Sequence, residues 1–173
     1  MLELEVKAAL SDDALERLRH LNLSRIDRQI QVDTYYRHPS IDFVANDEAL
    51  RIRRSDDKTI VTYKGPRLSR DTKMREEHEV IVNDFNEARA IFQRLGFIEV
   101  ATVEKTRQRF QQKGLCIMID DVRDLGRFIE VEVLVEDQIA QAEGRVFAFL
   151  EGIGISRKNT IRESYLELLS KKA

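Results

Sequence analysis

The chain opens with a strict alternation of charged and apolar residues. In the stretch Glu3-Leu4-Glu5-Val6-Lys7, every second side chain is charged. Because successive side chains of a β-strand point to opposite faces, this pattern predicts a strand with Glu3, Glu5 and Lys7 on one side. Two carboxylates spaced in this way lie about 7 Å apart and can share one divalent cation. A strand whose charged face is merely solvated gives the same pattern, so this stretch alone leaves both interpretations open.

Seven further stretches predict strands by the same criteria. Each shows a two-residue alternation or a β-branched and aromatic composition, and turn-forming residues separate them. The expected strands cover residues 30–37, 49–54, 59–64, 75–82, 104–110, 115–120 and 127–133. Together with the first stretch they make eight strands, several of them joined as hairpins.

Four stretches predict amphipathic helices. The first covers residues 12–21 after the N-cap Ser11, and the second starts at the N-cap Asp84. The third carries apolar residues at helical spacing over 139–150, and the fourth begins at a Thr160-x-x-Glu163 capping box. We therefore expect a chain that is rich in strands, with four helices available to cover them.

The two halves of the chain follow the same order of elements. A strand with two spaced glutamates, a helix and three strands occur in residues 1–64 and again in residues 75–135, about 72 residues later. This order suggests one sheet unit used twice around a shared interior, followed by helices in residues 136–173. We expect a single domain over residues 1–173.

Composition and charge exclude several classes of protein. The 173 residues are 35% charged, above the globular norm of about 25%, yet the net charge is only -2. This balance argues against a protein that coats duplex nucleic acid. The single Cys116 excludes an intramolecular disulfide and a multi-cysteine zinc site, and it fits a reducing, cytoplasmic setting. No apolar run approaches the roughly 18 residues of a membrane span, so we expect no membrane partner.

The signs of the charges are segregated by strand. The acids would be Glu3, Glu5, Glu77, Glu79, Asp120, Glu130 and Glu132, and the bases Arg51, Arg53, Lys64, Lys105 and Arg107. If the charged faces were only solvated, the apolar faces would pack as a sandwich and the charges would be scattered. Segregation favours a barrel with the charges inside and amphipathic helices outside. Isolated buried charges are unfavourable, so such an interior suits a polyanion bound together with a divalent cation.

A set of short motifs follows in order along the chain. They are Glu3-x-Glu5-x-Lys7, Gln31-x-Asp33-x-Tyr35, Leu50-Arg51-x-Arg53, Tyr63-Lys64-Gly65-Pro66, Arg75-x-Glu77, Lys105-x-Arg107-x-x-Phe110, Asp120 with Leu125-Gly126, Glu130-x-Glu132 and Ser164-Tyr165. The ordered set resembles the CYTH, or triphosphate tunnel metalloenzyme, family, most closely its class IV adenylyl cyclase-like branch. The resemblance implies an α+β fold, an eight-stranded antiparallel β-barrel (the triphosphate tunnel) with helices packed outside.

The resemblance also implies roles for eleven residues. The metal ligands for Mg²⁺ or Mn²⁺ would be Glu3, Glu5, Asp120, Glu130 and Glu132. The triphosphate would be held by Arg51, Arg53, Lys64, Lys105 and Arg107. Lys7 and Glu5 would act at the reacting group. Roles for Glu77, Glu79 and Arg109 are left open, and pairing with neighbouring arginines is the simpler expectation for the two glutamates.

Three functions fit these residues. The first is an adenylyl cyclase that converts ATP to cyclic AMP and pyrophosphate. The second is a hydrolase of inorganic triphosphate or thiamine triphosphate on the same fold. Both reactions need in-line positioning and neutralisation of charge, so the motifs do not separate them. The third is a non-catalytic module that binds polyanions and needs no acidic patch. The expected partner is a small triphosphate, and a homodimer is an open alternative to a monomer.

Overall fold

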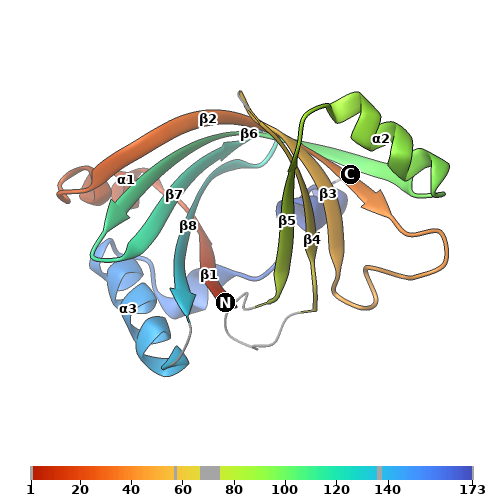
Figure 1. Ribbon diagram of the computed structural model, residues 1–173. Coiled ribbons are helices and arrows are strands. Elements are labelled where there is room, and N and C mark those ends of the chain that lie inside the picture. Colours follow the sequence, from red (N-terminus) through yellow and green to blue (C-terminus); the bar gives the residue numbers. More distant parts are fainter. Residues whose placement is uncertain (1, 57, 67–74, 136–137, 173) are drawn as a thin grey trace.

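One antiparallel sheet dominates the computed structural model, which describes residues 2–56, 58–66, 75–135 and 138–172 (Figure 1). Its strands within these residues are β1 (Leu2–Ala9), β2 (Ser24–Arg37), β3 (Ala49–Arg54), β4 (Thr59–Lys64), β5 (Glu77–Val82), β6 (Ile98–Gln112), β7 (Leu115–Val122), β8 (Gly126–Val135) and the short β9 (Thr160–Ile161). Every pair of neighbouring strands is antiparallel.

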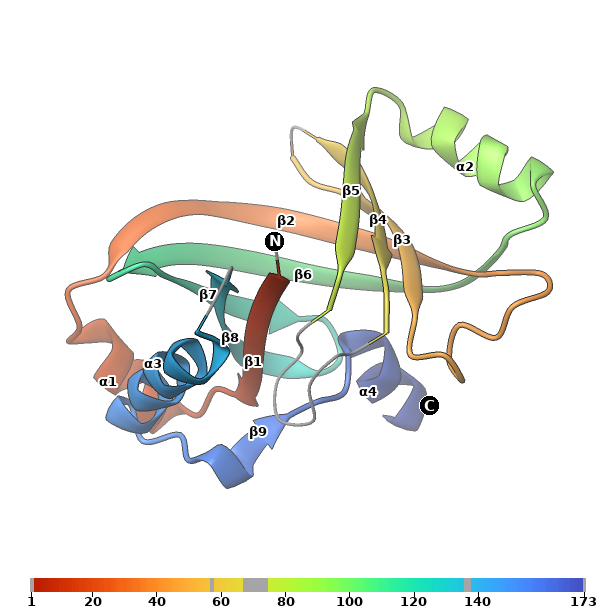
Figure 2. The ribbon, with the colours of Figure 1, turned by 60° about the horizontal axis from the view of Figure 1, so that its bottom comes forward.

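The sheet curls so that its two ends approach each other. Its order is β5-β4-β3-β2-β6-β7-β8-β1-β9, and Figure 2 shows β1 and β5 coming forward from opposite sides. Among the described residues, one isolated bridge between Glu3 and Arg75 joins these sides. The predicted antiparallel fold is therefore confirmed, but the expected closed barrel is an open, curled sheet with a single closing bridge.

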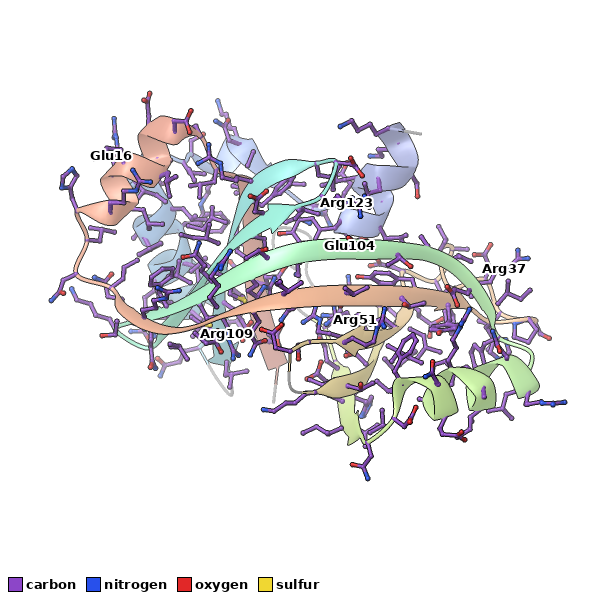
Figure 3. The ribbon with its side chains drawn as sticks, turned by 90° about the horizontal axis from the view of Figure 1, so that it is seen from above. Glu16, Arg37, Arg51, Glu104, Arg109 and Arg123 are labelled. Carbon is purple, nitrogen blue, oxygen red and sulfur yellow. The ribbon has the colours of Figure 1, made fainter. Side chains whose placement is uncertain are left out.

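β2 and β6 are longer than the sequence pattern predicted. They pair from Ser24 opposite Gln111 to Arg37 opposite Ile98, and they form the long arch over the molecule in Figure 1. Seen from above, they cross the whole molecule side by side (Figure 3). The first residues of β2 are polar and lack a strand pattern, so their pairing with β6 determines their conformation.

The helices are α1 (Asp12–Arg19), α2 (Phe85–Arg94), α3 (Ile139–Gly152) and α4 (Tyr165–Lys172), with a 3₁₀ turn at Arg157–Asn159. The predicted caps of the first two are confirmed: Ser11 accepts a hydrogen bond from the backbone of Ala14, and Asp84 accepts from Asn86 and Glu87. Within the described residues, no helix has both the length and the apolar character needed to cross a membrane.

The predicted start of the last helix is wrong. Thr160 and Ile161 form β9, which pairs with β1 instead of capping a helix. The capping box lies four residues later, where Ser164 Oγ accepts from the Glu167 backbone at 3.1 Å and a Glu167 carboxylate oxygen accepts from the Ser164 backbone at 2.6 Å. This places Tyr165 at the first position of α4.

The apolar faces of the strands point outward to the helices, as expected. Leu4 and Val6 of β1 belong to a buried cluster that also contains Ala14 and Leu18 of α1 and Val146 of α3. A second cluster packs α2 against β2 and β3. α4 differs, because its first residues line the interior cavity described below. Three helices therefore cover the outer face, and the charged faces of the strands point inward.

The order β1-α1-β2-β3-β4 recurs as β5-α2-β6-β7-β8. This recurrence places Glu3 and Glu5 of β1 and Glu77 and Glu79 of β5 at corresponding positions. That the two halves are copies of one unit within a single domain stays a prediction.

Candidate functional site

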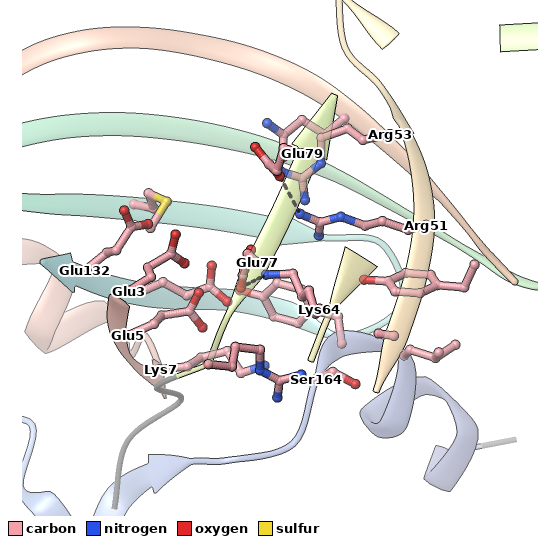
Figure 4. Close-up of a pocket in the computed structure, with 18 of the residues that line it drawn as sticks. Glu3, Glu5, Lys7, Arg51, Arg53, Lys64, Glu77, Glu79, Glu132 and Ser164 are labelled. Atoms are coloured by element: carbon pink, nitrogen blue, oxygen red, sulfur yellow. Dashed lines mark hydrogen bonds and ion pairs between the residues drawn. The ribbon is translucent and has the colours of Figure 1, made fainter. Parts of the chain in front are cut away.

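The inner face of the curled sheet surrounds a cavity of about 540 Å³ (Figure 4). Every predicted site residue lines this cavity except Asp120, which lies behind its wall. Strand register explains the convergence, because each of these residues occupies an inward position of an antiparallel ladder. The cavity also contains the aromatic ring of Tyr165, which α4 brings to the end of the ladder.

Carboxylates gather on one side of the cavity. β1 pairs with β8 so that Glu5 lies opposite Glu132 and Lys7 opposite Glu130. Figure 4 shows Glu3, Glu5 and Glu132 together on the side away from Arg51. We call Glu3, Glu5 and Glu132 the acidic wall.

The acidic wall is electrostatically crowded. Burial, followed by the charge of Glu132, raises the pKa of Glu3 to about 8. Burial, followed by the charge of Glu5, raises the pKa of Glu132 to about 7. A cation between such carboxyl groups would stabilise their ionised form.

The donor set of the acidic wall fits a hard divalent cation such as Mg²⁺ or Mn²⁺. In the described part of the chain, however, no three acidic, histidine or cysteine side chains already form a compact metal site. Mg²⁺ is commonly held by one or two carboxylates together with the phosphates of a substrate. The acidic wall therefore suits a cation that arrives with an anionic ligand.

Four cations that line the cavity form what we call the basic wall: Arg51, Arg53, Lys105 and Arg107. Figure 4 shows Arg51 and Arg53 on the side away from the acidic wall. Asp33 of β2, which is fully buried, holds two of them. Arg53 donates two hydrogen bonds to its carboxylate at 2.6 and 2.8 Å, and Arg51 donates one at 3.3 Å. Burial alone would raise the pKa of Asp33, but the charges of Arg51 and Arg53 outweigh it and hold this pKa below its ordinary value.

Asp120 holds the other two cations. It is completely buried and accepts hydrogen bonds from Lys105 at 3.0 Å, from Arg107 at 2.7 Å and from the Tyr165 hydroxyl at 2.9 Å. Arg107 also pairs with Glu130. These contacts favour a role for Asp120 in orienting cations. Its expected role as a metal ligand stays a prediction that this arrangement does not favour.

The ring of Tyr165 lies close to two lysines. The ammonium of Lys7 lies 4.1 Å from the ring centre and that of Lys105 lies 4.9 Å from it. Both distances permit a cation–π interaction, which is strongest when desolvated. Burial, followed by the charge of Arg107, lowers the pKa of Lys105 to about 8. Tyr165 thus contacts both Lys7 of β1 and Lys105 of the basic wall.

The remaining predicted phosphate ligand, Lys64, pairs with Glu77 of β5 (Figure 4). Glu79 accepts a hydrogen bond from Thr62 at 2.8 Å and lies 4.0 Å from Arg51. The expected pairing with an arginine is met at Glu79, through Arg51, whereas Glu77 pairs with a lysine. Arg75 instead donates to the backbone oxygen of Asp47 at 3.4 Å.

Gln31 is a site residue to which the sequence reasoning gave no role. Its amide nitrogen donates to Gln29 at 3.3 Å, Gln29 donates to Asp27 at 3.2 Å, and Asp27 pairs with Arg109. Within the described residues, the carbonyl oxygen of Gln31 and Nε of Arg51 are buried without a hydrogen-bond partner. Both residues line the cavity, and buried polar atoms of this kind are normally satisfied by a ligand or an ordered water.

The sequence reasoning also gave no role to Asp33 or Tyr165. Both had appeared as members of motifs, Gln31-x-Asp33-x-Tyr35 and Ser164-Tyr165. The inward parity of Asp33 relative to Gln31 was the available signal for that residue. No local pattern could show that Tyr165 reaches Asp120, 45 residues away in sequence.

Comparison with known families decides the classification of this cavity-forming sheet. The family model of the CYTH domain matches residues 1–165 of the sequence. This range includes β1 to β8 and ends at Tyr165. The chain belongs to the CYTH domain family. The resemblance inferred from the ordered motifs is therefore confirmed.

Individual relatives cover nearly the whole chain. The protein named "Putative adenylate cyclase MJ0240", from Methanocaldococcus jannaschii, is 38% identical over 172 residues, which are 97% of this chain and 98% of that protein. The structure of PH1819 from Pyrococcus horikoshii OT3 is also 38% identical, with a TM-score of 0.91 and 99% coverage of both chains. A Hippeastrum structure, titled as a putative adenylyl cyclase with a dominant triphosphatase activity, shares the fold at 18% identity, with a TM-score of 0.72 and coverage of 99% and 95%.

Proposed function

We propose that this CYTH domain protein is a divalent-metal-dependent enzyme that converts ATP to cyclic AMP and pyrophosphate. The observation that supports it most is a single cavity lined by both a basic wall and an acidic wall. A triphosphate needs the first, and a metal that accompanies it needs the second. The named activity of the 38% identical Methanocaldococcus jannaschii relative points to the same substrate.

The basic wall would hold the triphosphate. A guanidinium has five N–H donors, and Arg53 uses only two of them on Asp33. The remaining donors can bind phosphate oxygens in the fork geometry that arginine favours. Because Asp33 and Asp120 already orient these cations, little conformational freedom is lost when the ligand binds. Lys64 would add a point charge on β4.

The acidic wall would hold Mg²⁺ or Mn²⁺, which when bound supplies neutralisation of charge on the phosphates and the leaving pyrophosphate. In the proposed reaction, the ribose 3′ oxygen forms a bond to the α-phosphorus, and the bond from that phosphorus to the β-phosphate oxygen breaks. Glu5 takes the proton that the hydroxyl loses. Lys7, two residues further along β1, orients the reacting phosphate and offsets its developing charge.

A second candidate is hydrolysis of inorganic or organic triphosphates. The buried carbonyl oxygen of Gln31 supports it, because an acceptor fixed among cations can orient a water for attack on phosphorus. The Hippeastrum protein shows that this fold can carry such an activity. The non-catalytic alternative is less well supported, because three crowded carboxylates would oppose binding of a polyanion unless a cation joined them.

Product analysis tests the proposal. The protein is incubated separately with ATP, inorganic triphosphate and thiamine triphosphate, each with Mg²⁺ and with Mn²⁺. We expect cyclic AMP and pyrophosphate from ATP. Formation of ADP and phosphate instead would identify the protein as a hydrolase and refute the cyclase reaction. Tight binding without turnover of any compound would refute both enzymatic functions.

A further inference from the structure

The first turn of α4 belongs to the wall of the cavity. Four consecutive residues, 164–167, line it. Behind them, Leu168 and Leu169 pack against a buried apolar cluster that contains Phe128 and Tyr165. Burial of these apolar side chains attaches the helix to the sheet. α4 therefore contributes to the site a segment that belongs to neither the acidic wall nor the basic wall.

The side chain of Tyr165 is held by contacts at its ring and at its hydroxyl. Only 6% of the residue is exposed. Its ring packs edge to face on that of Phe128, with centroids 5.2 Å apart, and its hydroxyl donates to Asp120 at 2.9 Å. The capping box of Ser164 and Glu167 fixes the backbone at the same point. The protein thus sets the position of the ring before any ligand binds.

Two lysines of the cavity are buried beside this ring. Lys7 is 1% exposed and Lys105 is 5% exposed, so water solvates neither ammonium well. A buried charge is unfavourable unless other groups replace the lost water. The face of an aromatic ring attracts a cation that lies within about 6 Å of its centre. Both ammonium groups lie within that distance of the centre of the Tyr165 ring, at 4.1 and 4.9 Å.

The lysines need such a contact more than the arginines do. Lysine carries a point charge on a flexible four-carbon chain, whereas the guanidinium of arginine is a planar fork. Asp33 and Asp120 orient the arginines of the basic wall through directed hydrogen bonds. Lys7 lies on β1, two residues after Glu5 of the acidic wall. The ring of Tyr165 restricts where its charge can lie, as the buried carboxylates do for the arginines.

We propose that Tyr165 is a positioning residue, whose ring face holds the ammonium groups of Lys7 and Lys105 where they meet the phosphates of the bound triphosphate. The inference rests on the proposed function and adds α4 to the elements on which the reaction depends. Lys7 comes from β1 and Lys105 from β6, so one ring on a third segment sets the positions of both charges. Small displacements of charges at a reacting group reduce the rate strongly.

Fluorinated phenylalanines test this role, because fluorine withdraws electron density from the ring face and changes the size of the ring little. Tyr165→Phe is the starting variant, and the phenylalanine is then replaced by analogues with one, two and three fluorine atoms. Turnover of ATP with Mg²⁺ is measured together with the dissociation constant of a non-hydrolysable ATP analogue. We expect kcat to fall progressively, by about tenfold with three fluorines, while KM changes less.

The same fluorinated analogues at Phe128 are the matched control. Phe128 is buried in the same cluster and does not line the cavity, and no cation of the described residues lies over its ring. We expect no progressive change there. An equal decline at both positions would assign the effect to packing of the cluster and refute the proposal. The hydrogen bond to Asp120 is missing from every member of the Tyr165 series, so its loss does not produce a gradient.

The two measurements separate this inference from the proposed reaction. If neither kcat nor the dissociation constant changes along the Tyr165 series, the ring does not position the lysines. If wild type converts no triphosphate but the analogue binds progressively more weakly along the series, the proposed reaction fails and the role of Tyr165 stands. Absence of turnover together with a constant dissociation constant refutes both. If Tyr165→Phe alone abolishes turnover, the dissociation constants decide in the same way.

Discussion

The two walls of the cavity are built on different electrostatic principles. On the basic wall, each arginine already has a buried carboxylate partner, Asp33 for Arg51 and Arg53 and Asp120 for Arg107. On the acidic wall, burial and neighbouring carboxylates raise the pKa of Glu3, through Glu132, and the pKa of Glu132, through Glu5. The basic wall is organised before a ligand arrives, whereas the acidic wall lowers the stability of the metal-free protein.

This difference indicates that binding of the metal ion depends on binding of the triphosphate. A preorganised basic wall can bind phosphate oxygens directly. The acidic wall becomes favourable only when a cation neutralises it, and the cation needs phosphate oxygens to complete its coordination. The two ligands should therefore strengthen each other's binding, and substitutions in the two walls should affect stability in opposite directions.

The largest effect is expected on the basic wall. Arg107→Met leaves the buried carboxylates of Asp120 and Glu130 without their shared guanidinium. We expect the free energy of unfolding to fall by about 3–5 kcal/mol, measured by chemical denaturation. Arg123→Met is the control, because Arg123 is 68% exposed and solvent screens its pair with Glu104, so its loss should hardly change stability. Equal losses of stability in the two variants would show that the buried contacts of Arg107 contribute no more than an exposed ion pair.

A smaller loss of stability, about 3 kcal/mol, is expected for Asp33→Asn, which leaves Arg51 and Arg53 without their shared buried counter-charge. The native pKa of Asp33 lies below the ordinary value of 3.8, so its contribution is complete above that pH and is lost as the pH falls further. Unfolding of variant and wild type should therefore differ less at pH 2 than at pH 7. A difference that is independent of pH would contradict this assignment. In turnover, kcat should fall more than KM changes, because the cations remain but lose their orientation.

The acidic wall should respond in the opposite direction. Glu132→Gln removes a carboxylate whose pKa is raised from 4.5 to about 7. Because the unfolded chain loses this proton at lower pH, the native charge destabilises the metal-free protein increasingly between pH 4.5 and 7. The variant should therefore be more stable than wild type by about 1 kcal/mol at pH 8 without metal, and it should lose metal-dependent turnover. A less stable variant, or one with full activity, would remove Glu132 from the proposed metal site.

The smallest effect concerns Lys105, whose pKa burial lowers to about 8. As the pH rises through this value, the Lys105 ammonium loses its proton, and the basic wall of the free enzyme loses one positive charge. The wild-type kcat/KM for a triphosphate should then fall a few-fold between pH 8 and 9. Lys105→Arg keeps its charge over this range, so its profile should lack this fall even if its activity is lower. Identical profiles for both proteins would exclude Lys105 as the titrating group.

Local patterns allowed the inward faces of the strands to be predicted. The alternation around Glu3 and Glu5 is specified by strand geometry alone, and it correctly placed Leu4 against the helices. Long-range pairing could not be predicted in this way. Thr160-x-x-Glu163 and Ser164-x-x-Glu167 both satisfy the capping pattern, and only the pairing of β9 with β1 selects the second.

The candidate site shows the same difference between what a local pattern predicts and what contacts between distant segments determine. The parity of a strand predicts that a charge points inward, but it does not say which opposite charge lies beside it. Asp120 has the parity of a metal ligand, yet its oxygens accept from Lys105, Arg107 and Tyr165, which come from β6 and α4. Contacts between distant segments, which no local pattern encodes, thus separate the carboxylates that orient cations from those available to a metal.

The most direct test of the two-wall account is the coupling between metal and triphosphate. Binding of Mn²⁺ is measured by calorimetry in the absence and in the presence of a saturating non-hydrolysable ATP analogue. We predict at least about tenfold tighter binding of Mn²⁺ with the analogue present, and by reciprocity the same factor for the analogue with Mn²⁺. The same Mn²⁺ affinity with and without the analogue would contradict a site in which the acidic wall and the bound triphosphate share one cation.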